Sequence, residues 1–150
     1  MGFGEFDQWG NVNVSRLGGL TVGPGGFIDI AQNAKKVIFC GSFQAKGTKL
    51  AFGDGQLIVE NQGSIQKLVN QVDQITFSGQ QASAQGQEVL YVTERAVFRL
   101  SEDGLELIEI APGVDLEHDV LDQMEFTPII AKTMNRMPQA CFQMEFDLDK

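Results

Sequence analysis

The sequence predicts an α/β domain with an open, mixed, partly parallel sheet and flanking helices, and it predicts that this sheet is incomplete. A helix-periodic apolar segment leads directly into the continuous apolar run "KVIFC", which is typical of a strand in a parallel sheet. Residues 88–110 alternate like antiparallel strands around the turn "EDG". A parallel strand needs neighbours on both sides, and few candidates precede "KVIFC", so part of the sheet is missing.

A short strand and a helix are expected at the start. Val12 and Val14 alternate with asparagines, which suits a half-buried strand. A helix is predicted over residues 26–34, and its apolar side chains share one broad face: Phe27, Ile28, Ile30, Ala31 and Ala34. Lys35 and Lys36 are expected in its last turn, where cations suit the helix dipole.

The middle of the chain is predicted to consist mostly of strands. "KVIFC" is expected to be buried on both faces. Two β-prone runs around "GDG" predict a hairpin within residues 48–61. "QITFS", residues 74–78, is a further candidate strand, and residues 79–87 are expected to be a solvated loop. Residues 88–110 should then form a three-stranded meander.

The hydrophobic period changes from strand to helix after "APG". Asp115 is a suitable N-cap for a helix whose buried stripe combines Leu116, Val120, Leu121 and Met124. Residues 127–150 are ambiguous, and we expect a short helix followed by a mobile end.

Composition excludes several classes of protein. With 11 Lys and Arg against 20 Asp and Glu, the net charge of -9 argues against a nucleic-acid binder. No apolar run approaches the length of a membrane span, and the first residues do not resemble a secretory signal. These features favour the cytoplasm. Cys40 is expected to be a buried, inert thiol, and a disulfide with Cys141 is left open.

The stretch "GPGGF" before the first helix is the strongest candidate site. It comprises Gly23, Gly25, Gly26 and Phe27. Glycine permits positive φ and close approach of a ligand, and the first N–H groups of a helix lack internal partners. They could donate to an anion or to a developing oxyanion. A tight structural turn is the alternative, and the spacing matches neither the dinucleotide fingerprint nor the Walker loop.

Other polar residues give weaker signals. His118, the single histidine, lies among acids and is expected to be solvated. Glu94 and Arg95 are expected to form a surface ion pair of little energetic value. One histidine and two distant cysteines cannot form a metal-ligand cluster. Three lysines near the glycines could attract phosphates or simply be a polar helix end: Lys35, Lys36 and Lys46.

Several stretches together resemble the class I coenzyme A transferases, in particular the fused-chain short-chain acyl (acetate) type. They occur in the family's order: "GNVNVSRLGG", "GPGGFIDIAQNAKKVIFCGSF", "ITFSG", "GQEVLYVTERAVFRL", "GLELIEIAPGVDLEHDVLDQMEF" and "PII". The resemblance implies the NagB/RpiA/CoA transferase-like fold. It also implies that residues 1–130 are the C-terminal part of the β-type domain and that residues 131–150 are a C-terminal tail.

The resemblance also implies a reaction and a site. Such enzymes move coenzyme A between short-chain carboxylates through a glutamyl-CoA thioester, with coenzyme A as substrate and no separate cofactor. The family's glycine motif maps onto Gly23, Gly25, Gly26 and Phe27, whose backbone N–H groups would hold thioester oxyanions. The nucleophilic glutamate would precede residue 1, because Glu5 lies in the wrong motif context. No catalytic residue is therefore assigned here.

The resemblance leaves the role of the chain open. It implies a partner that supplies the missing transferase half, or a homo-oligomer, and it predicts that the chain alone is inactive. One alternative is a non-catalytic fragment that acts as a structural or interaction domain. Another is an acyl-CoA thioesterase that uses a local carboxylate such as Glu5 or Asp29.

Overall fold

The computed structural model describes residues 1–143 of the 150-residue chain. The mobile end expected for the tail lies mainly outside the described residues. The short helix expected there corresponds to the 3₁₀ turn η3, Gln139–Phe142. An eight-residue strand, which the sequence did not suggest, precedes it and crosses residue 130.

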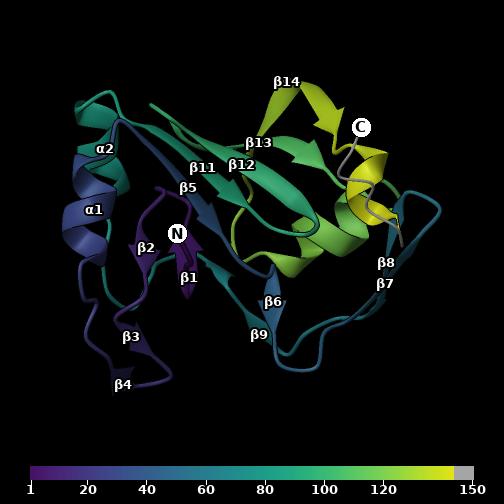
Figure 1. Cartoon of the computed structure of the whole chain (residues 1–150), viewed down its shortest axis with the longest axis horizontal. Helices are drawn as coiled ribbons and strands as arrows, with labels where there is room; N and C mark the ends of the chain where they lie inside the picture. Colours follow the sequence, from purple (N-terminus) through teal and green to yellow (C-terminus); the bar gives the residue numbers. More distant parts are fainter. Residues whose placement is uncertain (144–150) are drawn as a thin grey trace.

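A five-stranded mixed sheet forms the framework of the molecule (Figure 1). Its order is β14-β13-β12-β11-β5, and both outer pairs, β5 with β11 and β13 with β14, are parallel. The inner pairs are antiparallel, as the predicted meander requires. The strands are β5 Lys36–Cys40, β11 Glu88–Val92, β12 Ala96–Ser101, β13 Gly104–Ile110 and β14 Ile129–Arg136. The expected open, mixed, partly parallel α/β sheet is thereby confirmed.

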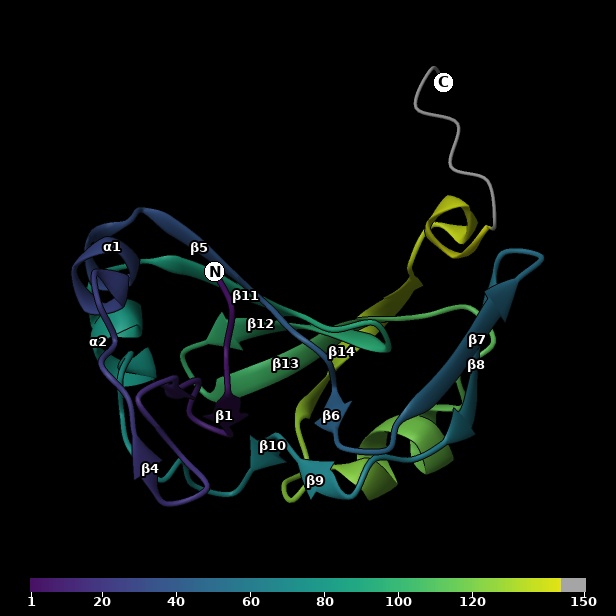
Figure 2. The same ribbon diagram turned by 60° about the horizontal axis from the view of Figure 1, so that its bottom comes forward.

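Smaller sheets surround this framework. A three-stranded sheet, with β1 between β10 and β2, lies against one face of the main sheet (Figure 2). Three two-stranded ladders complete the strands: β3 with β4, β6 with β9 and β7 with β8. Their bounds are β1 Glu5–Asp7, β2 Val12–Asn13, β3 Arg16–Leu17, β4 Leu20–Thr21, β6 Gln44–Ala45, β7 Lys49–Gly53, β8 Gln56–Asn61, β9 Ile65–Gln66 and β10 Leu68–Val69.

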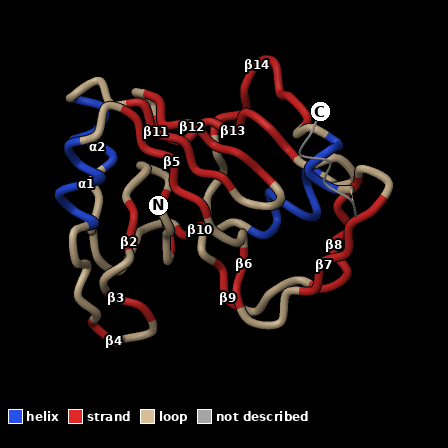
Figure 3. Tube along the Cα trace, viewed as in Figure 1, coloured by secondary structure: helices blue, strands red, loops and turns tan. Residues whose placement is uncertain are grey.

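The helices are short and gather at two ends of the molecule (Figure 3). The α-helices α1, Phe27–Asn33, and α2, Gly79–Ala84, lie together at one end. The π-helical turn η1, Leu116–Val120, and the 3₁₀ turn η2, Leu121–Gln123, lie at the other, near η3. None of the helices in residues 1–143 has the length and apolar character needed to span a bilayer.

An aromatic cluster joins the two layers. The ring of Phe6 in β1 lies 4.9 Å from Tyr91 and 5.8 Å from Phe98, measured between centroids. Phe39 in β5 lies 5.5 Å from Tyr91 and 5.8 Å from Phe27 at the start of α1. The Tyr91 hydroxyl donates to the Gly10 carbonyl at 2.5 Å, so its one polar group is satisfied inside the core. These contacts fix β1 and α1 against the same face of the sheet.

The strand "KVIFC" is buried on one face, not on both. Val37 and Phe39 point into the core, whereas Ile38 and Cys40 are exposed. β5 is the last named strand on its side of the sheet, and no described element covers its outer face. The prediction that Cys40 is buried is therefore wrong, and both cysteines are free and exposed.

The first residues of the chain continue the sheet beyond β5. The amino group of Met1 donates to the Ile38 carbonyl, and the Cys40 amide donates to the Met1 carbonyl, each at 2.7 Å. Gly2 forms a parallel bridge with Cys40. Residues 1–2 therefore take the position of a further parallel strand beside the end of β5.

The segment before β11 differs from the prediction. Residues 74–78 contribute one isolated bridge, from Phe77 to Val12, and no strand. The expected solvated loop over residues 79–87 begins with α2. The Ser78 side chain accepts the Gln81 amide and caps this helix, and Ala82 is fully buried. A cap followed by small residues permits a short helix that hydrophobic periodicity does not reveal.

The helix after the glycine-rich stretch forms as predicted but with a narrower buried face. It begins at Phe27 and ends at Asn33, so Lys35 and Lys36 lie beyond its last turn. Phe27 and Ala31 are buried, whereas Ile28 and Ile30 are exposed. The broad apolar face is thus only half covered by the described chain.

Two other predictions from local patterns are confirmed. The "GDG" hairpin pairs β7 with β8, and its turn residues Asp54 and Gly55 have φ of 53° and 74°, as a primed turn requires. Asp115 caps the helical segment after "APG" by accepting the His118 amide at 2.7 Å. The segment forms π and 3₁₀ turns instead of an α-helix, and the predicted stripe packs on the core.

Arg95 is the main departure from the predicted surface. The predicted Glu94–Arg95 ion pair forms, but the prediction that it lies on the surface is wrong, because the Arg95 side chain is completely buried. Its guanidinium donates to four groups: Glu94 Oε1 at 3.2 Å, Gln62 Oε1 at 2.6 Å, the Asp119 carbonyl at 3.0 Å and Gln44 Oε1 at 3.1 Å. Burial lowers the pKa of Arg95, and the neighbouring Glu94 carboxylate opposes that shift. Arg95 thus ties the main sheet to β6, the end of β8 and η1.

Replacing Arg95 with lysine should destabilise the domain. Lysine keeps the charge but cannot reproduce the planar fork, so buried acceptors lose their donors. We expect the free energy of unfolding to fall by about 2–4 kcal/mol, because each unsatisfied buried group costs about 1–3 kcal/mol. Urea denaturation of Arg95→Lys measures this change.

The matched control is Arg99→Lys, since Arg99 forms a half-exposed ion pair with Glu106. It should change the free energy of unfolding by no more than about 0.5 kcal/mol. Equal losses in the two variants would contradict the role assigned to Arg95.

Candidate functional site

The glycine-rich segment lies between two anchored points on the surface. Before it, the Val22 amide donates to the Ser15 carbonyl at 2.8 Å, and the Ser15 and Thr76 hydroxyls lie 2.8 Å apart. After it, the buried ring of Phe27 packs on Phe39. The loop is therefore held at both ends while its glycines stay exposed.

A buried asparagine shapes the approach to the loop. Asn13 is fully buried, and its side-chain oxygen accepts the amides of Ser15 and Arg16, each at 3.0 Å. Its side-chain nitrogen donates to Glu5 at 2.8 Å and to the Arg16 carbonyl at 2.5 Å. The "NVNVS" stretch therefore supports the turn that carries the β3–β4 hairpin and the loop.

The loop backbone uses the conformational freedom of one glycine. Gly25 has φ of +58°, and no atom lies within 4 Å of the position that a Cβ would take there. Gly26 is the N-cap of α1 with φ of -81°, and it provides no side-chain cap. A positive φ at Gly25 turns the chain into the helix without a steric penalty.

Three amide groups of the loop have no acceptor. The Phe27 amide donates to the Pro24 carbonyl at 3.1 Å, so it is already satisfied. The amides of Gly23, Gly25 and Gly26 donate to no carbonyl or side chain within residues 1–143. Among the four predicted residues, the three glycines thus offer free donors, and those of Gly25 and Gly26 lie directly before α1. Phe27 instead anchors the loop through its ring.

Exposed apolar side chains flank the loop on both sides along the chain. Leu20 and Val22 precede the loop with 74% and 50% of their surface exposed. Ile28 and Ile30 follow it with 46% and 63% exposed. Large apolar side chains grouped in this way usually mark an interaction site. In the described part of the chain, nothing covers this surface.

The lysines expected near the loop do not form one group. Lys36 makes an ion pair with Glu88 at 2.7 Å, at the start of β5. Lys46 follows β6, which lies far from the β4–α1 loop in both views (Figures 1 and 2). These lysines therefore do not form a basic cluster beside the glycine loop.

Of the two acidic candidates, Asp29 is exposed in the first turn of α1, directly after the loop. Glu5 and the histidine lie outside a reactive arrangement. The Glu5 carboxylate accepts Asn13 Nδ2 and the Asp73 amide, both at 2.8 Å, so it is occupied structurally. His118 is exposed, and its hydrogen bond to Asp119 raises its pKa, as does the charge of that carboxylate. Across residues 1–143, no three His, Cys, Asp or Glu side chains gather closely enough to hold a metal ion.

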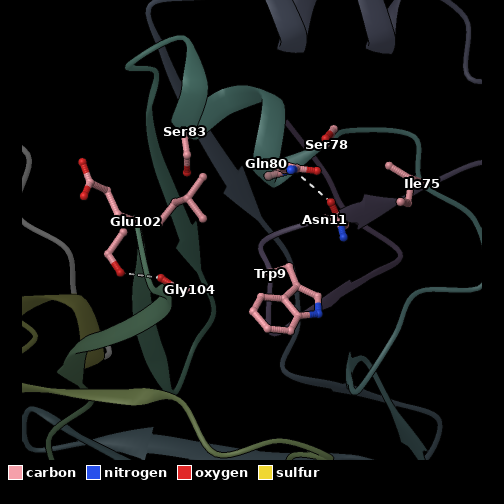
Figure 4. Close-up of a pocket in the computed structure, with 11 residues that line it drawn as sticks. Trp9, Asn11, Ile75, Ser78, Gln80, Ser83, Glu102 and Gly104 are labelled. Atoms are coloured by element: carbon pink, nitrogen blue, oxygen red, sulfur yellow. Dashed lines mark hydrogen bonds between the residues drawn. The ribbon is translucent and has the colours of Figure 1, made fainter.

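A cavity of about 470 Å³ lies away from the loop, between Trp9, the start of α2 and the β12–β13 turn (Figure 4). Trp9 is 58% exposed and borders it together with Ile75 and Leu100. The side-chain oxygen of Asn11 faces this cavity but already accepts a hydrogen bond from the Gly79 amide. The sequence analysis did not single out this cavity, because its lining comes from three distant segments.

Comparison with known proteins finds relatives that are named as coenzyme A transferases. No model of a protein family matches it. Acetate CoA-transferase YdiF of Escherichia coli O157:H7 is 49% identical over 142 residues, which are 95% of this chain and 27% of that protein. Caffeate CoA-transferase of Acetobacterium woodii is 47% identical over 152 residues, which are 98% of this chain and 29% of that protein. The chain therefore spans less than a third of these relatives.

Solved structures agree with the fold. The acyl-CoA transferase (YdiF) apoenzyme of Escherichia coli O157:H7 has a TM-score of 0.93 at 48% identity, covering 96% of this chain and 28% of that one. Glutaconate coenzyme A-transferase of Acidaminococcus fermentans has a TM-score of 0.63 at 19% identity, covering 91% of this chain and 51% of that one. The second similarity concerns the fold alone.

Replacing Gly25 with valine should destabilise the loop through its backbone and not through a clash. A left-handed conformation costs a side-chain-bearing residue about 1–2 kcal/mol, and the space around Gly25 is open. We expect the free energy of unfolding to fall by about that amount in Gly25→Val, as measured by urea denaturation.

Gly23→Ala is the control, since Gly23 lacks a positive φ and its surroundings are also open. Its stability should remain within about 0.5 kcal/mol of the original. If the two variants were equally stable, Gly25 would not require its left-handed conformation.

Proposed function

The chain is homologous to a segment of the class I coenzyme A transferases, and we propose that it is the part of such an enzyme that carries the oxyanion loop. The enzyme would move coenzyme A between short-chain carboxylates through a glutamyl-CoA thioester. The observation that carries this proposal is the pair of free amides at Gly25 and Gly26, exposed at the start of α1.

These amides suit the charge that develops in acyl transfer. When a nucleophile adds to a thioester carbonyl, the oxygen becomes negatively charged. Backbone donors that are already oriented stabilise this charge without reorganising. Gly25 and Gly26 would meet that need, because the loop is held at both ends and the dipole of α1 favours an anion at its start. Phe27 keeps the donors in place through its contact with Phe39.

The remainder of the site would come from outside this chain. Glu5 is engaged with Asn13 and Asp73, which supports an upstream position for the nucleophilic glutamate. Lys36 is engaged with Glu88, so the phosphates of coenzyme A would be bound by other residues. The apolar rim formed by Leu20, Val22 and Ile30 supports contact with the missing half of the transferase. The proposed setting is the cytoplasm.

The choice of carboxylate would also be made elsewhere. Acetate CoA-transferase and caffeate CoA-transferase are named for acids of very different size, yet they are 49% and 47% identical to this chain. The segment that they share with it would then serve the chemistry common to both. We propose that it handles the thioester and that absent segments build the acyl pocket.

A structural or interaction domain is the second candidate. The exposed apolar side chains around the loop favour binding to another protein, whether or not the amides take part in a reaction. The third alternative is a thioesterase based on Glu5 or Asp29. Glu5 is less favoured, because that carboxylate already accepts two hydrogen bonds, whereas Asp29 lies exposed in the first turn of α1.

The purified chain should not exchange coenzyme A between acetyl-CoA and a second carboxylate, because it carries only part of the proposed site. Clear turnover by the chain alone would contradict the proposal. The positive test is a chimera in which this chain replaces the matched segment of the Escherichia coli acetate CoA-transferase. The chimera should exchange coenzyme A.

Gly25→Val in that chimera should lower kcat by about 10²–10³-fold, comparable to the loss of an oxyanion donor. Valine keeps the backbone amide but disfavours the left-handed φ that orients it. Gly23→Ala is the control for a substitution in the same loop at a glycine without a positive φ, and it should leave kcat nearly unchanged. If both variants of the chimera retained full activity, the interaction domain would describe this chain better than the oxyanion loop.

A further inference from the structure

The Asn13 side chain holds both polar groups of the Arg16 backbone from a fully buried position. Its Oδ1 accepts the Arg16 amide at 3.0 Å, and its Nδ2 donates to the Arg16 carbonyl at 2.5 Å. The same side chain accepts the Ser15 amide at 3.0 Å and donates to Glu5 Oε1 at 2.8 Å. Both lone pairs and both N–H groups of this side chain are therefore used inside the protein.

These bonds set the direction of the Ser15 carbonyl. A peptide unit is planar and trans, so its N–H and its C=O point in opposite directions. Because Asn13 holds the Arg16 N–H, the Ser15 C=O of the same peptide unit must point away from Asn13. It accepts the Val22 amide at 2.8 Å. The direction of this acceptor is thus determined by the asparagine.

Val22 transmits this constraint to the glycine loop. It directly precedes Gly23, and the next residue, Pro24, has the fixed φ of a proline. The Pro24 carbonyl in turn accepts the Phe27 amide at 3.1 Å. Few free backbone dihedral angles therefore separate the Val22 amide from the two free amides directly before α1.

From these contacts we propose that Asn13 is a positioning residue for the oxyanion loop and acts through the Ser15–Arg16 peptide unit and Val22. The inference rests on the proposed function, because that function gives the loop amides their task. Asn13 is fully buried and acts without touching substrate. It fixes the direction of the loop amides, and donors with a fixed direction stabilise a developing oxyanion without reorganising.

Asn13→Asp tests this role with a side chain of the same shape. The introduced carboxylate can still accept two amides, but it has no donor and faces Glu5 Oε1, which lies 2.8 Å from Asn13 Nδ2. Two carboxylates at that separation cannot both ionise readily, so the pair keeps one proton to a pH above the usual carboxylate range. Protonation returns a donor to the pair. The defect should therefore be largest at neutral pH and smaller in acid.

The other charged groups beside this pair are already engaged. Arg16 makes a salt bridge with Asp73 at 3.3 Å, and the Asp73 amide donates to Glu5 Oε1 at 2.8 Å. Both ionic side chains of this salt bridge keep their charge between neutral pH and about pH 5. A pH dependence confined to Asn13→Asp would thus come from the new carboxylate pair.

Asn11 offers a matched control from the same stretch. It is also buried, and its Nδ2 donates to a carboxylate oxygen, Asp7 Oδ2, at 3.1 Å. Its Oδ1 accepts the Gly79 amide at the start of α2, far along the chain from the loop. Asn11→Asp therefore creates a similar carboxylate pair without a connection to Val22.

The first measurement is amide hydrogen exchange of the isolated chain, followed by NMR. The protection factor of the Val22 amide is compared with those of the core amides in β11 and β12, which report global unfolding. In Asn13→Asp at neutral pH this ratio should fall about tenfold or more, because the acceptor of the Val22 amide loses its fixed direction. The loss should shrink at about pH 5. Asn11→Asp should leave the ratio within about twofold.

An uncharged variant covers the case in which Asn13→Asp does not fold at neutral pH. Asn13→Ser keeps a hydroxyl but is too short to hold both polar groups of Arg16. It should lower the same ratio of protection factors at every pH, without recovery in acid.

The second measurement is kcat in the chimera described above. Asn13→Asp should lower kcat about tenfold or more at neutral pH and leave KM for acetyl-CoA within about threefold, because the loop donors act in the transition state. Relative to the parent chimera, kcat should recover as the pH falls. Asn11→Asp should lower kcat no more than about twofold.

Three results would overturn the positioning role. They are an unchanged protection ratio in both Asn13 variants, equal losses of kcat in Asn13→Asp and Asn11→Asp, and a lowered protection ratio with an unchanged kcat. A parent chimera that fails to exchange coenzyme A defeats the proposed function, whereas the hydrogen exchange of the isolated chain still decides whether Asn13 holds the loop.

Discussion

The packing of Phe27 on Phe39 is the contact on which the arrangement of the loop depends. Phe39 belongs to β5, whose position is set by parallel pairing with β11, and it also contacts Tyr91 of that neighbouring strand. Phe27 is the first residue of α1 and directly follows Gly26. The sheet therefore determines where the helix starts, and the start of the helix determines where the free amides lie. Without this aromatic contact, the loop would be anchored only on the side of Val22, whose amide donates to the Ser15 carbonyl.

The chain leaves apolar side chains exposed in two places. Leu20, Val22, Ile28 and Ile30 lie exposed on either side of the glycine loop, and Ile38 lies exposed on β5. Under the proposed function, both places would pack against the remainder of a longer enzyme, because the chain spans less than a third of its relatives.

Local sequence patterns predicted the elements whose structure depends on residues close to one another in the chain. The "GDG" hairpin follows from turn chemistry, and the meander follows from alternation. The helix after Gly26 follows from its period.

The burial of Arg95 could not be predicted in this way, because its partners Gln44 and Gln62 lie 51 and 33 residues away. The exposure of Cys40 was also missed. An apolar strand is predicted to be buried on both faces, and the sequence of the strand does not show whether residues of the same chain pack on each face. Among the candidate site residues, sequence analysis found the glycines but could not separate the free amides from the satisfied amide of Phe27.

The most direct test of the account is a crystal structure of the chimeric enzyme trapped as its coenzyme A thioester. The account predicts that the thioester oxygen lies about 2.7–3.1 Å from the amide nitrogen of Gly25, of Gly26 or of both, the distance at which such donors act. A thioester oxygen bound by other groups, with these two amides directed toward solvent or another part of the protein, would contradict it.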